Sequence, residues 1–264
     1  MVRELINELH FWELVLLCIS TLTILTYLSA VISTRLITFP VDKEHRSLSN
    51  SLIGILSAGF SVLLAFIIIN SWNYLLKTQD DLAKEADALA AIVRDVNVFP
   101  EPVKEKLMTE LRNYIHLARV HEWETLKQGI DNRQAWETIY NLFVTLQSFD
   151  PHTNLERIYY AQIVRNLETV SETRRNRLAR LESIIPDKLN SALIIGSIIL
   201  VVILGLMRGE KNFLNIAPVL FFSIVLGFNL AIALSFNYPY SGDISVSNKF
   251  FYEGILSNFT DPDK

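Results

Sequence analysis

Small or weakly polar side chains recur along one side of an apolar stretch and form the most suggestive chemical pattern in this sequence. They are Gly54, Ser57, Ala58, Ser61 and Ala65. At about 100° per residue these positions share one helical face. Such a face can line a narrow, weakly polar pathway. It can also let a second helix approach closely, which is the more common use of small residues in membranes.

Two aromatic residues of the same stretch, Phe60 and Phe66, point to other sides of that helix. In a ring of subunits an aromatic face can form a hydrophobic constriction that gates by dewetting. Ordinary packing in the bundle or against lipid explains the two residues equally well. The pattern therefore indicates a candidate constriction without selecting between these roles.

A second group of candidates is charged and lies far from the apolar stretch in sequence. Arg174 and Arg177 belong to an arginine cluster, and Glu85 and Glu122 are acidic partners in neighbouring predicted helices. The arginines either form ion pairs with these carboxylates or contact anions and anionic lipid headgroups.

No catalytic centre stands out. The sequence has no phosphate-binding loop, no nucleophile motif and no paired-cysteine metal motif. His116 and His121 lack the spacing that places two histidines on one face of an α-helix. We therefore expect neither an enzyme nor a metal or other cofactor.

These candidates are positioned by four apolar runs, each long enough to cross a hydrocarbon layer of about 30 Å. The runs are Phe11–Ile32, Leu52–Asn70, Leu189–Met207 and Ile216–Phe236. We expect an all-α integral membrane protein with four transmembrane helices in a 2 + 2 arrangement and a large cytoplasmic helical insert between spans 2 and 3. The predicted parts are a helix pair over residues 1–76, the insert over 77–188, a second pair over 189–236 and a tail over 237–264.

The insert, Lys77–Lys188, carries 16 Lys/Arg and 18 Asp/Glu. This balance argues against a nucleic-acid partner. Its patterns predict helices over Asn73–Val96, Glu101–Lys127, Arg133–Phe149 and Asn154–Ile185, the first continuing directly from span 2. Basic residues near the span ends favour a cytoplasmic insert and cytoplasmic termini, although the short loops 33–51 and 208–215 are also basic.

Short motifs in a matching order resemble those of bacterial membrane proteins of unknown function that carry a bestrophin-like domain. The matching stretches are Gly59–Phe66 with Trp72, Glu85-Ala86 with Leu89, Glu122-Trp123, Arg174/Arg177/Leu178, Pro186 and Tyr240-Ser241-Gly242. The resemblance implies a bacterial inner-membrane location and a distant similarity to bestrophins, which are pentameric anion channels whose second helix lines the pore. An acidic cluster like the bestrophin calcium clasp is missing, so calcium gating is not implied.

The leading hypothesis is a bestrophin-like homo-oligomeric ion channel, a pentamer by resemblance, that passes small anions along span 2 and is surrounded by membrane lipids. A second hypothesis is a stator-like subunit of a proton-driven membrane complex, because such subunits also place a large insert between two span pairs. A third is a non-conducting scaffold or sensor whose helical insert binds a cytosolic partner.

Overall fold

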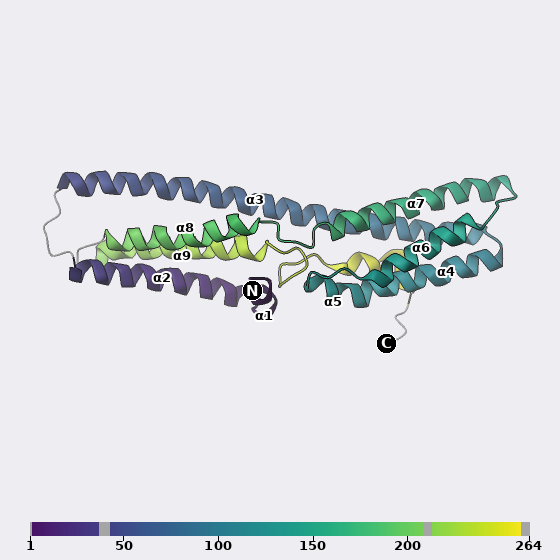
Figure 1. The fold of residues 1–264 in the computed structure, drawn as a ribbon, viewed down its shortest axis with the longest axis horizontal. Helices are drawn as coiled ribbons and strands as arrows, with labels where there is room; N and C mark the ends of the chain where they lie inside the picture. The colour runs from purple at the N-terminus through teal and green to yellow at the C-terminus, as the bar shows by residue number, and fades with distance from the viewer. Residues whose placement is uncertain (1, 37–42, 208–212, 260–264) are drawn as a thin grey trace. The chain divides into compact units, whose positions relative to one another are not determined.

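The computed structural model describes residues 2–36, 43–207 and 213–259, and the helices in these ranges account for most of the chain (Figure 1). The α-helices are α1 (Val2–Glu8), α2 (Phe11–Leu36), α3 (Lys43–Asp95), α4 (Glu101–His116), α5 (Glu122–Lys127), α6 (Arg133–Gln147), α7 (Asn154–Leu178), α8 (Asp187–Leu206) and α9 (Phe213–Ser235). Shorter helical segments are η1 (Val96–Val98), the π-helical η2 (Leu117–His121), η3 (Asn248–Tyr252) and η4 (Gly254–Asn258).

Within the described ranges there is no strand, so the expectation of an all-helical chain is confirmed. Four helices are long and apolar enough to cross a membrane: Phe11–Arg35, Ser47–Val98, Asp187–Leu206 and Ile216–Ser235. Each coincides with one of the four apolar runs, two of which, Leu189–Met207 and Ile216–Phe236, extend one residue beyond the helix. The loops 33–51 and 208–215, whose charges entered the topology argument, lie partly outside the described residues.

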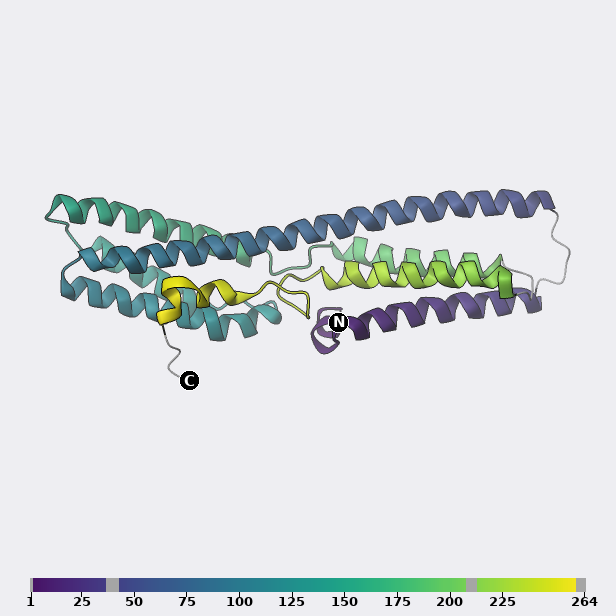
Figure 2. The ribbon, with the colours of Figure 1, turned by 180° about the vertical axis from the view of Figure 1, so that it is seen from behind.

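The chain divides into two compact units, and the first contains the apolar helices. In this unit α2 packs along both α8 and α9, while the first half of α3 lies on the other side of α8 and α9 (Figures 1 and 2). Glycine permits the closest approaches. A Cβ at Gly227 of α9 would lie 2.8 Å from Ile19 Cα, and one at Gly205 of α8 would lie 2.5 Å from the Thr26 carbonyl oxygen. The helices around α2 are therefore tightly fitted.

A polar contact joins the start of α2 to the segment that follows α9. One carboxylate oxygen of Asp243 accepts a hydrogen bond from the backbone N–H of Phe11 at 2.8 Å and lies 3.4 Å from His10 Nδ1. The backbone of Gly242 makes this turn in the left-handed region, at φ 74°, against the side chain of Ile6. Asp243 thus caps the first turn of α2, whose leading N–H groups have no intrahelical acceptor.

This cap predicts a defined response to acid. The hydrogen bond from the Phe11 N–H, followed by the contact with His10, lowers the pKa of Asp243 below its usual value. A carboxylate with a lowered folded-state pKa contributes stability above its unfolded pKa and loses that contribution as pH falls through the folded value. Asp243→Asn keeps a capping oxygen but does not titrate.

We therefore expect the difference in thermal unfolding midpoint between the wild type and Asp243→Asn to shrink as pH falls below about 4. The measurement is a pH series in detergent, with Asp243→Ala as a variant that loses the cap and about 1 kcal/mol at neutral pH. A pH-independent difference would contradict the role of the charge.

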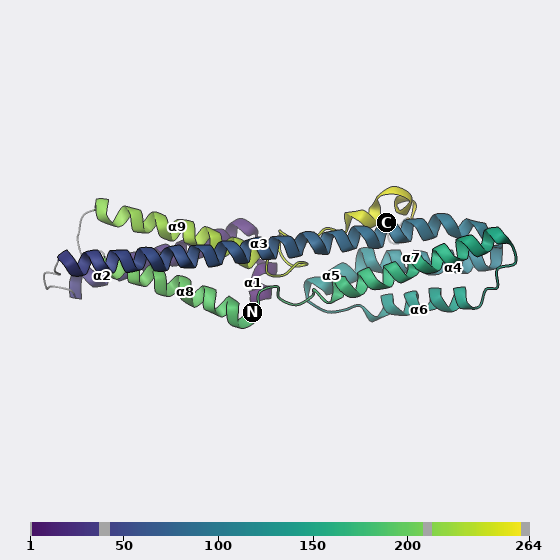
Figure 3. The same ribbon diagram turned by 90° about the horizontal axis from the view of Figure 1, so that it is seen from above.

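The second unit is built from the rest of α3 with α4–α7 and the C-terminal segment. Helix α3 contains neither glycine nor proline between Asn73 and Asp95, and it continues unbroken from the apolar half, as the sequence predicts. Its inward side chains, including Leu82, Leu89 and Ile92, join a buried core. Figure 3 shows α4–α7 gathered beside the second half of α3, within this unit.

The helices of this unit differ from the prediction in two places. The predicted helix over Asn154–Ile185 ends at Leu178, after which Arg180 and Leu181 donate to carbonyls only three residues earlier. The N–H groups of Ile184 and Ile185 donate to Asn237 and so do not continue a helical ladder. Leu155, assigned to the predicted seam of this helix, is 57% exposed.

The predicted helix over Glu101–Lys127 is also interrupted. Its middle is the π-helical η2, whose wider turn brings the rings of His116 and His121 to a centroid separation of 5.5 Å. The spacing argument made for these residues assumed an α-helix and was therefore wrong about their proximity. No group that could hold a metal ion is present among the residues described.

Candidate functional site

Helix α3 uses one stripe of its apolar half to pack on the rest of its unit. Ile53, Leu64, Ile67 and Ser71 are buried. From one to the next they are separated by eleven, three and four residues, which places all of them on a single helical face. Phe60 lies on this side and contacts α8, where a Cβ at Gly196 would be 2.7 Å from its ring. The missing side chain at Gly196 makes room for the aromatic ring.

The opposite face of α3 is bare. Ile55 and Val62 are each 70% exposed, Phe66 is 63% exposed and Ile69 is 58% exposed. Only 17% of the apolar window of α3 is buried, against 33% in α2, 33% in α8 and 39% in α9. Helix α3 therefore carries the largest uncovered apolar surface of the four.

The small-residue stripe lies between these two faces. Gly54, Ala58, Ser61 and Ala65 are exposed, Ser57 is half-buried, and a Cβ at Gly54 would meet no atom within 4 Å. Nothing in the described part of this unit packs closely on the stripe. The structure thus separates three faces of α3, namely the packed stripe with Phe60, the small stripe and the bare face with Phe66.

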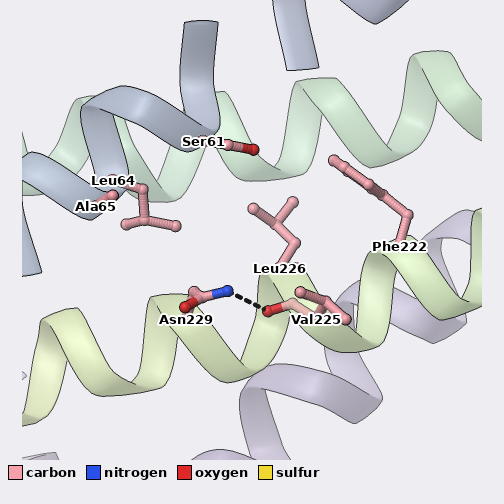
Figure 4. A pocket seen from close by; sticks show the side chains of 7 residues that line it. All are labelled: Ser61, Leu64, Ala65, Phe222, Val225, Leu226 and Asn229. Carbon is pink, nitrogen blue, oxygen red and sulfur yellow. Dashed lines mark hydrogen bonds between the residues drawn. The ribbon is translucent and has the colours of Figure 1, made fainter. Parts of the chain in front are cut away.

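A groove of about 140 Å³ runs along part of the small stripe, between α3 and α9. Figure 4 shows its lining by Ser61, Leu64, Ala65, Phe222, Val225, Leu226 and Asn229. Leu64 and Leu226 are almost fully buried and belong to the packed interior of the unit. The groove therefore opens outward from the packed helices.

Two polar side chains line this groove. The amide nitrogen of Asn229 donates to the Val225 carbonyl at 2.9 Å, within its own helix (Figure 4). Among the described residues, the Ser61 hydroxyl has no hydrogen-bond partner, whereas Ser197 and Ser223 donate to carbonyls four residues earlier in their helices. Ser61 and the second amide hydrogen of Asn229 remain available to another molecule.

The charged candidates lie in the other unit and are brought together by three separate helices. Arg177 of α7 donates to Glu85 of α3 at 3.0 Å and to Glu122 of α5 at 2.9 Å. Arg174 pairs with Glu122 and, at 3.3 Å, with Asp131. The side chains of both arginines and both glutamates have no exposed surface. Two cations and two anions thus balance inside the core.

Aromatic groups complete this ion-pair network. Tyr114 donates to Glu85 at 2.5 Å, and burial followed by the nearby Glu85 charge raises the pKa of Tyr114 well above its usual value. Burial disfavours the charge of Arg177, yet the Glu122 and Glu85 carboxylates raise its pKa. Because all four charged side chains are fully buried and paired with one another, the network is closed to solvent anions.

The arginine cluster does not act as one surface. Arg180 pairs with Asp81 and lies 5.3 Å from the ring of Tyr74, whereas Arg175 is exposed. One helical turn therefore mixes buried and exposed arginines, as expected when successive residues point to different sides of a helix.

Arg119 is a buried residue that the sequence patterns did not single out. It emerges from the π-helical η2, and its guanidinium donates to the carbonyls of Phe251, Leu256 and Phe259 and lies 4.5 Å from the Tyr252 ring. The C-terminal segment is therefore held by backbone contacts. No sequence signal marks a π-helical turn, and backbone acceptors leave no residue pattern, so this role was visible only in three dimensions.

Comparison with known proteins gives one match. The family model described as the bestrophin-like domain matches residues 8–251. The searches of curated proteins and of solved structures returned no match. The matched range covers the four apolar helices, the buried ion-pair network and the segment after α9. The chain therefore belongs to the family of proteins with a bestrophin-like domain.

Proposed function

We propose that this protein is a homo-oligomeric ion channel in which the bare face of α3 lines the pathway. The observation that carries the proposal is the contrast between the two sides of α3. One side packs on α8 and α9, while Ile55, Val62, Phe66 and Ile69 remain uncovered. In a ring of copies such residues form successive apolar girdles, which restrict ion passage by dewetting.

This proposal selects among the sequence candidates. Phe66 is assigned to the constriction, whereas Phe60 is assigned to packing within the subunit because it lies against Gly196. Glu85, Glu122, Arg174 and Arg177 are assigned to the stability of the helical unit and not to anion contact, because they are buried and mutually paired. A pentamer surrounded by lipids is the assembly that the family resemblance favours.

We further propose an orientation in the bacterial inner membrane with the helical insert and both termini in the cytoplasm, and with the four spans in a 2 + 2 arrangement. The support is the basic residues near the span ends on the insert side. Protease added to sealed inside-out vesicles should cut the 77–188 region, and protease added to right-side-out vesicles should not. The reverse pattern would refute this orientation.

Anion permeability is proposed from the charge next to the span. Lys77 on α3 is exposed and has no ion-pair partner in the described part of the chain. The nearby carboxylates are occupied, because Asp80 pairs with Lys84 at 2.6 Å and Asp81 pairs with Arg180. A ring of uncompensated lysines attracts anions and repels cations.

The function is tested by ion flux through the purified protein in liposomes, with chloride and potassium gradients applied separately and empty liposomes as the control. Chloride flux that exceeds potassium flux is the expected result. Absence of flux from folded, inserted protein would refute the channel and favour the stator-like or scaffold hypotheses. Co-purification of an acidic single-span partner would then separate those two.

The selectivity assignment has its own prediction. Lys77→Glu should shift the potassium-to-chloride permeability ratio toward potassium by about 30-fold, the equivalent of about 2 kcal/mol. The reason is that two charge units per copy change beside the pathway, at about 1 kcal/mol each in a water-filled setting. Lys106→Glu on α4 makes the same chemical change at another exposed site and should leave the ratio unaltered. Equal effects of the two variants would mean that overall charge, and not Lys77, sets the ratio.

A further inference from the structure

We infer that the groove between α3 and α9 receives Leu63 of α3 from a neighbouring copy of the chain, so that the small stripe is a subunit contact and not part of the pore lining. This inference rests on the oligomer in the proposed function. It assigns Gly54, Ala58, Ser61 and Ala65 to close helix approach, the second of the two roles that the sequence left open.

The two flanks of α3 differ in shape. At 3.6 residues per turn, the small stripe lies about a quarter-turn to one side of the packed stripe, and Leu56 and Leu63 lie about a quarter-turn to the other side. Leu56 is 59% exposed and Leu63 is 42% exposed. One flank of the same helix is therefore hollow where the other flank projects.

The small-residue flank and the leucine flank of α3 lie at matching depths in the membrane. A ring formed by rotation about the membrane normal keeps equivalent residues at equal depth, and its contacts join two different surfaces of each copy. Leu63 lies between Ser61 and Ala65 along the helix, and Leu56 lies between Gly54 and Ala58. Each leucine of one copy thus stands level with a pair of small residues on the next copy, like a knob facing a hole.

The groove itself fits such a knob. Its volume is about 140 Å³. An apolar cavity of about 150 Å³ accepts a benzene ring, which has more carbon atoms than the branched end of leucine. Lipid chains would also fill the space, but they offer no hydrogen-bonding groups to Ser61 or Asn229. A closely packed helix brings polar atoms beside both residues, which is how serine and asparagine stabilise helix contacts in membranes.

The contact leaves the other assignments intact. In each copy the small flank of α3 contacts one adjacent copy and the leucine flank contacts the other. The face of α3 that contains Val62, Phe66 and Ile69 then points between the two adjacent copies, away from α8 and α9. The small stripe then sets how closely neighbouring α3 helices approach. It thereby determines the width of the ring that Phe66 lines.

Paired cysteines test the contact directly. In a Cys18→Ala background, which removes the single native cysteine, the double variant Leu63→Cys with Ala65→Cys should form a ladder of linked chains after mild oxidation in membranes. Positions two apart on a helix do not face each other, so the pair cannot close within one chain. Each single variant should stay unlinked, because Leu63 meets Ala65 and not its own counterpart.

The control pair is Leu63→Cys with Leu16→Cys. Leu16 is 66% exposed on α2, which lies across α8 and α9 from α3, so this pair should not link. An unlinked Leu63/Ala65 pair would overturn the inference. Single variants that form linked chains as efficiently as the double variant would also overturn the inference, because they would indicate that the same residue of two copies is in contact.

A substitution series supplies a second readout. Ala65→Leu should fill the groove and shift the purified protein from the oligomer to single chains. Adding Leu63→Ala to Ala65→Leu should restore the oligomer, because the large side chain then lies on the opposite flank of α3. Failure to restore the oligomer would count against the insertion of Leu63 into the groove. The ladder does not depend on ion flow, so a ladder without flux would refute the channel alone, whereas flux without a ladder would refute only this contact.

Discussion

Phe66→Ala should raise ion flux through the reconstituted protein by about tenfold, which corresponds to a barrier lower by about 1.4 kcal/mol. The reason is the 63% exposure of Phe66 on the face of α3 that its own subunit leaves bare. In a ring, replacing this aromatic side chain by a methyl group widens the narrowest girdle and favours its wetting. Flux is measured in liposomes at equal protein density, with insertion quantified for each variant.

Phe60→Ala is the matched control, since it makes the same substitution six residues away on the same helix. Phe60 contacts α8 at Gly196 and is half-buried. Its loss should lower thermal stability, by about 1–2 kcal/mol, without raising flux. If Phe60→Ala raised flux and Phe66→Ala did not, the pathway would run on the α8 side of α3 and the proposed pore face would be refuted.

Arg177→Met should destabilise the protein by about 3–5 kcal/mol, the usual cost of removing one partner from a buried ion pair. Arg177 neutralises both Glu85 and Glu122 inside the core, and none of the three side chains has exposed surface. Its removal leaves a buried negative charge that only Arg174 can balance. The measurement is the thermal unfolding midpoint of the full chain in detergent, followed by the fluorescence of Trp123 and Trp136, which lie beside the two arginines.

Two further variants make this test specific. Arg175→Met makes the same chemical change at an exposed position of the same helix and should alter stability by about 0.5 kcal/mol or less. Adding Glu85→Leu to Arg177→Met removes the unpaired charge and should restore much of the loss. A double variant less stable than Arg177→Met would show that Glu85 stabilises the core mainly through Tyr114, which donates to it at 2.5 Å.

Some features of this protein followed from local sequence alone. Apolar runs near twenty residues long predict spanning helices because the backbone must satisfy its hydrogen bonds internally in lipid. The long α3 was predictable because no glycine or proline interrupts Asn73–Asp95. Thr153 and Glu156 form the capping box that starts α7, a pattern of two residues three positions apart. Each of these signals depends on neighbours within a few residues.

Other features depended on contacts between distant segments. The predicted helix does not reach Ile185, because Asn237, far along the chain, accepts the N–H groups of Ile184 and Ile185. The cap on α2 comes from Asp243, and the segment over 248–259 is held by Arg119 through carbonyl groups. Each of these contacts joins segments far apart in the sequence, and the Arg119 contacts are made to backbone carbonyls, which carry no side-chain signature, so periodicity could not have revealed them.

The sequence by itself determined the membrane class of the protein, the family resemblance and the residues that compete for a functional role on α3. It could not decide among those residues, because Phe60, Phe66 and the small stripe are all compatible with one amphipathic repeat. The tertiary structure distinguished them by showing which side of α3 lies against Gly196 and which side stays exposed. The physical reason is that a helix fixes the angles between its faces, whereas only packing against other helices determines which face is covered.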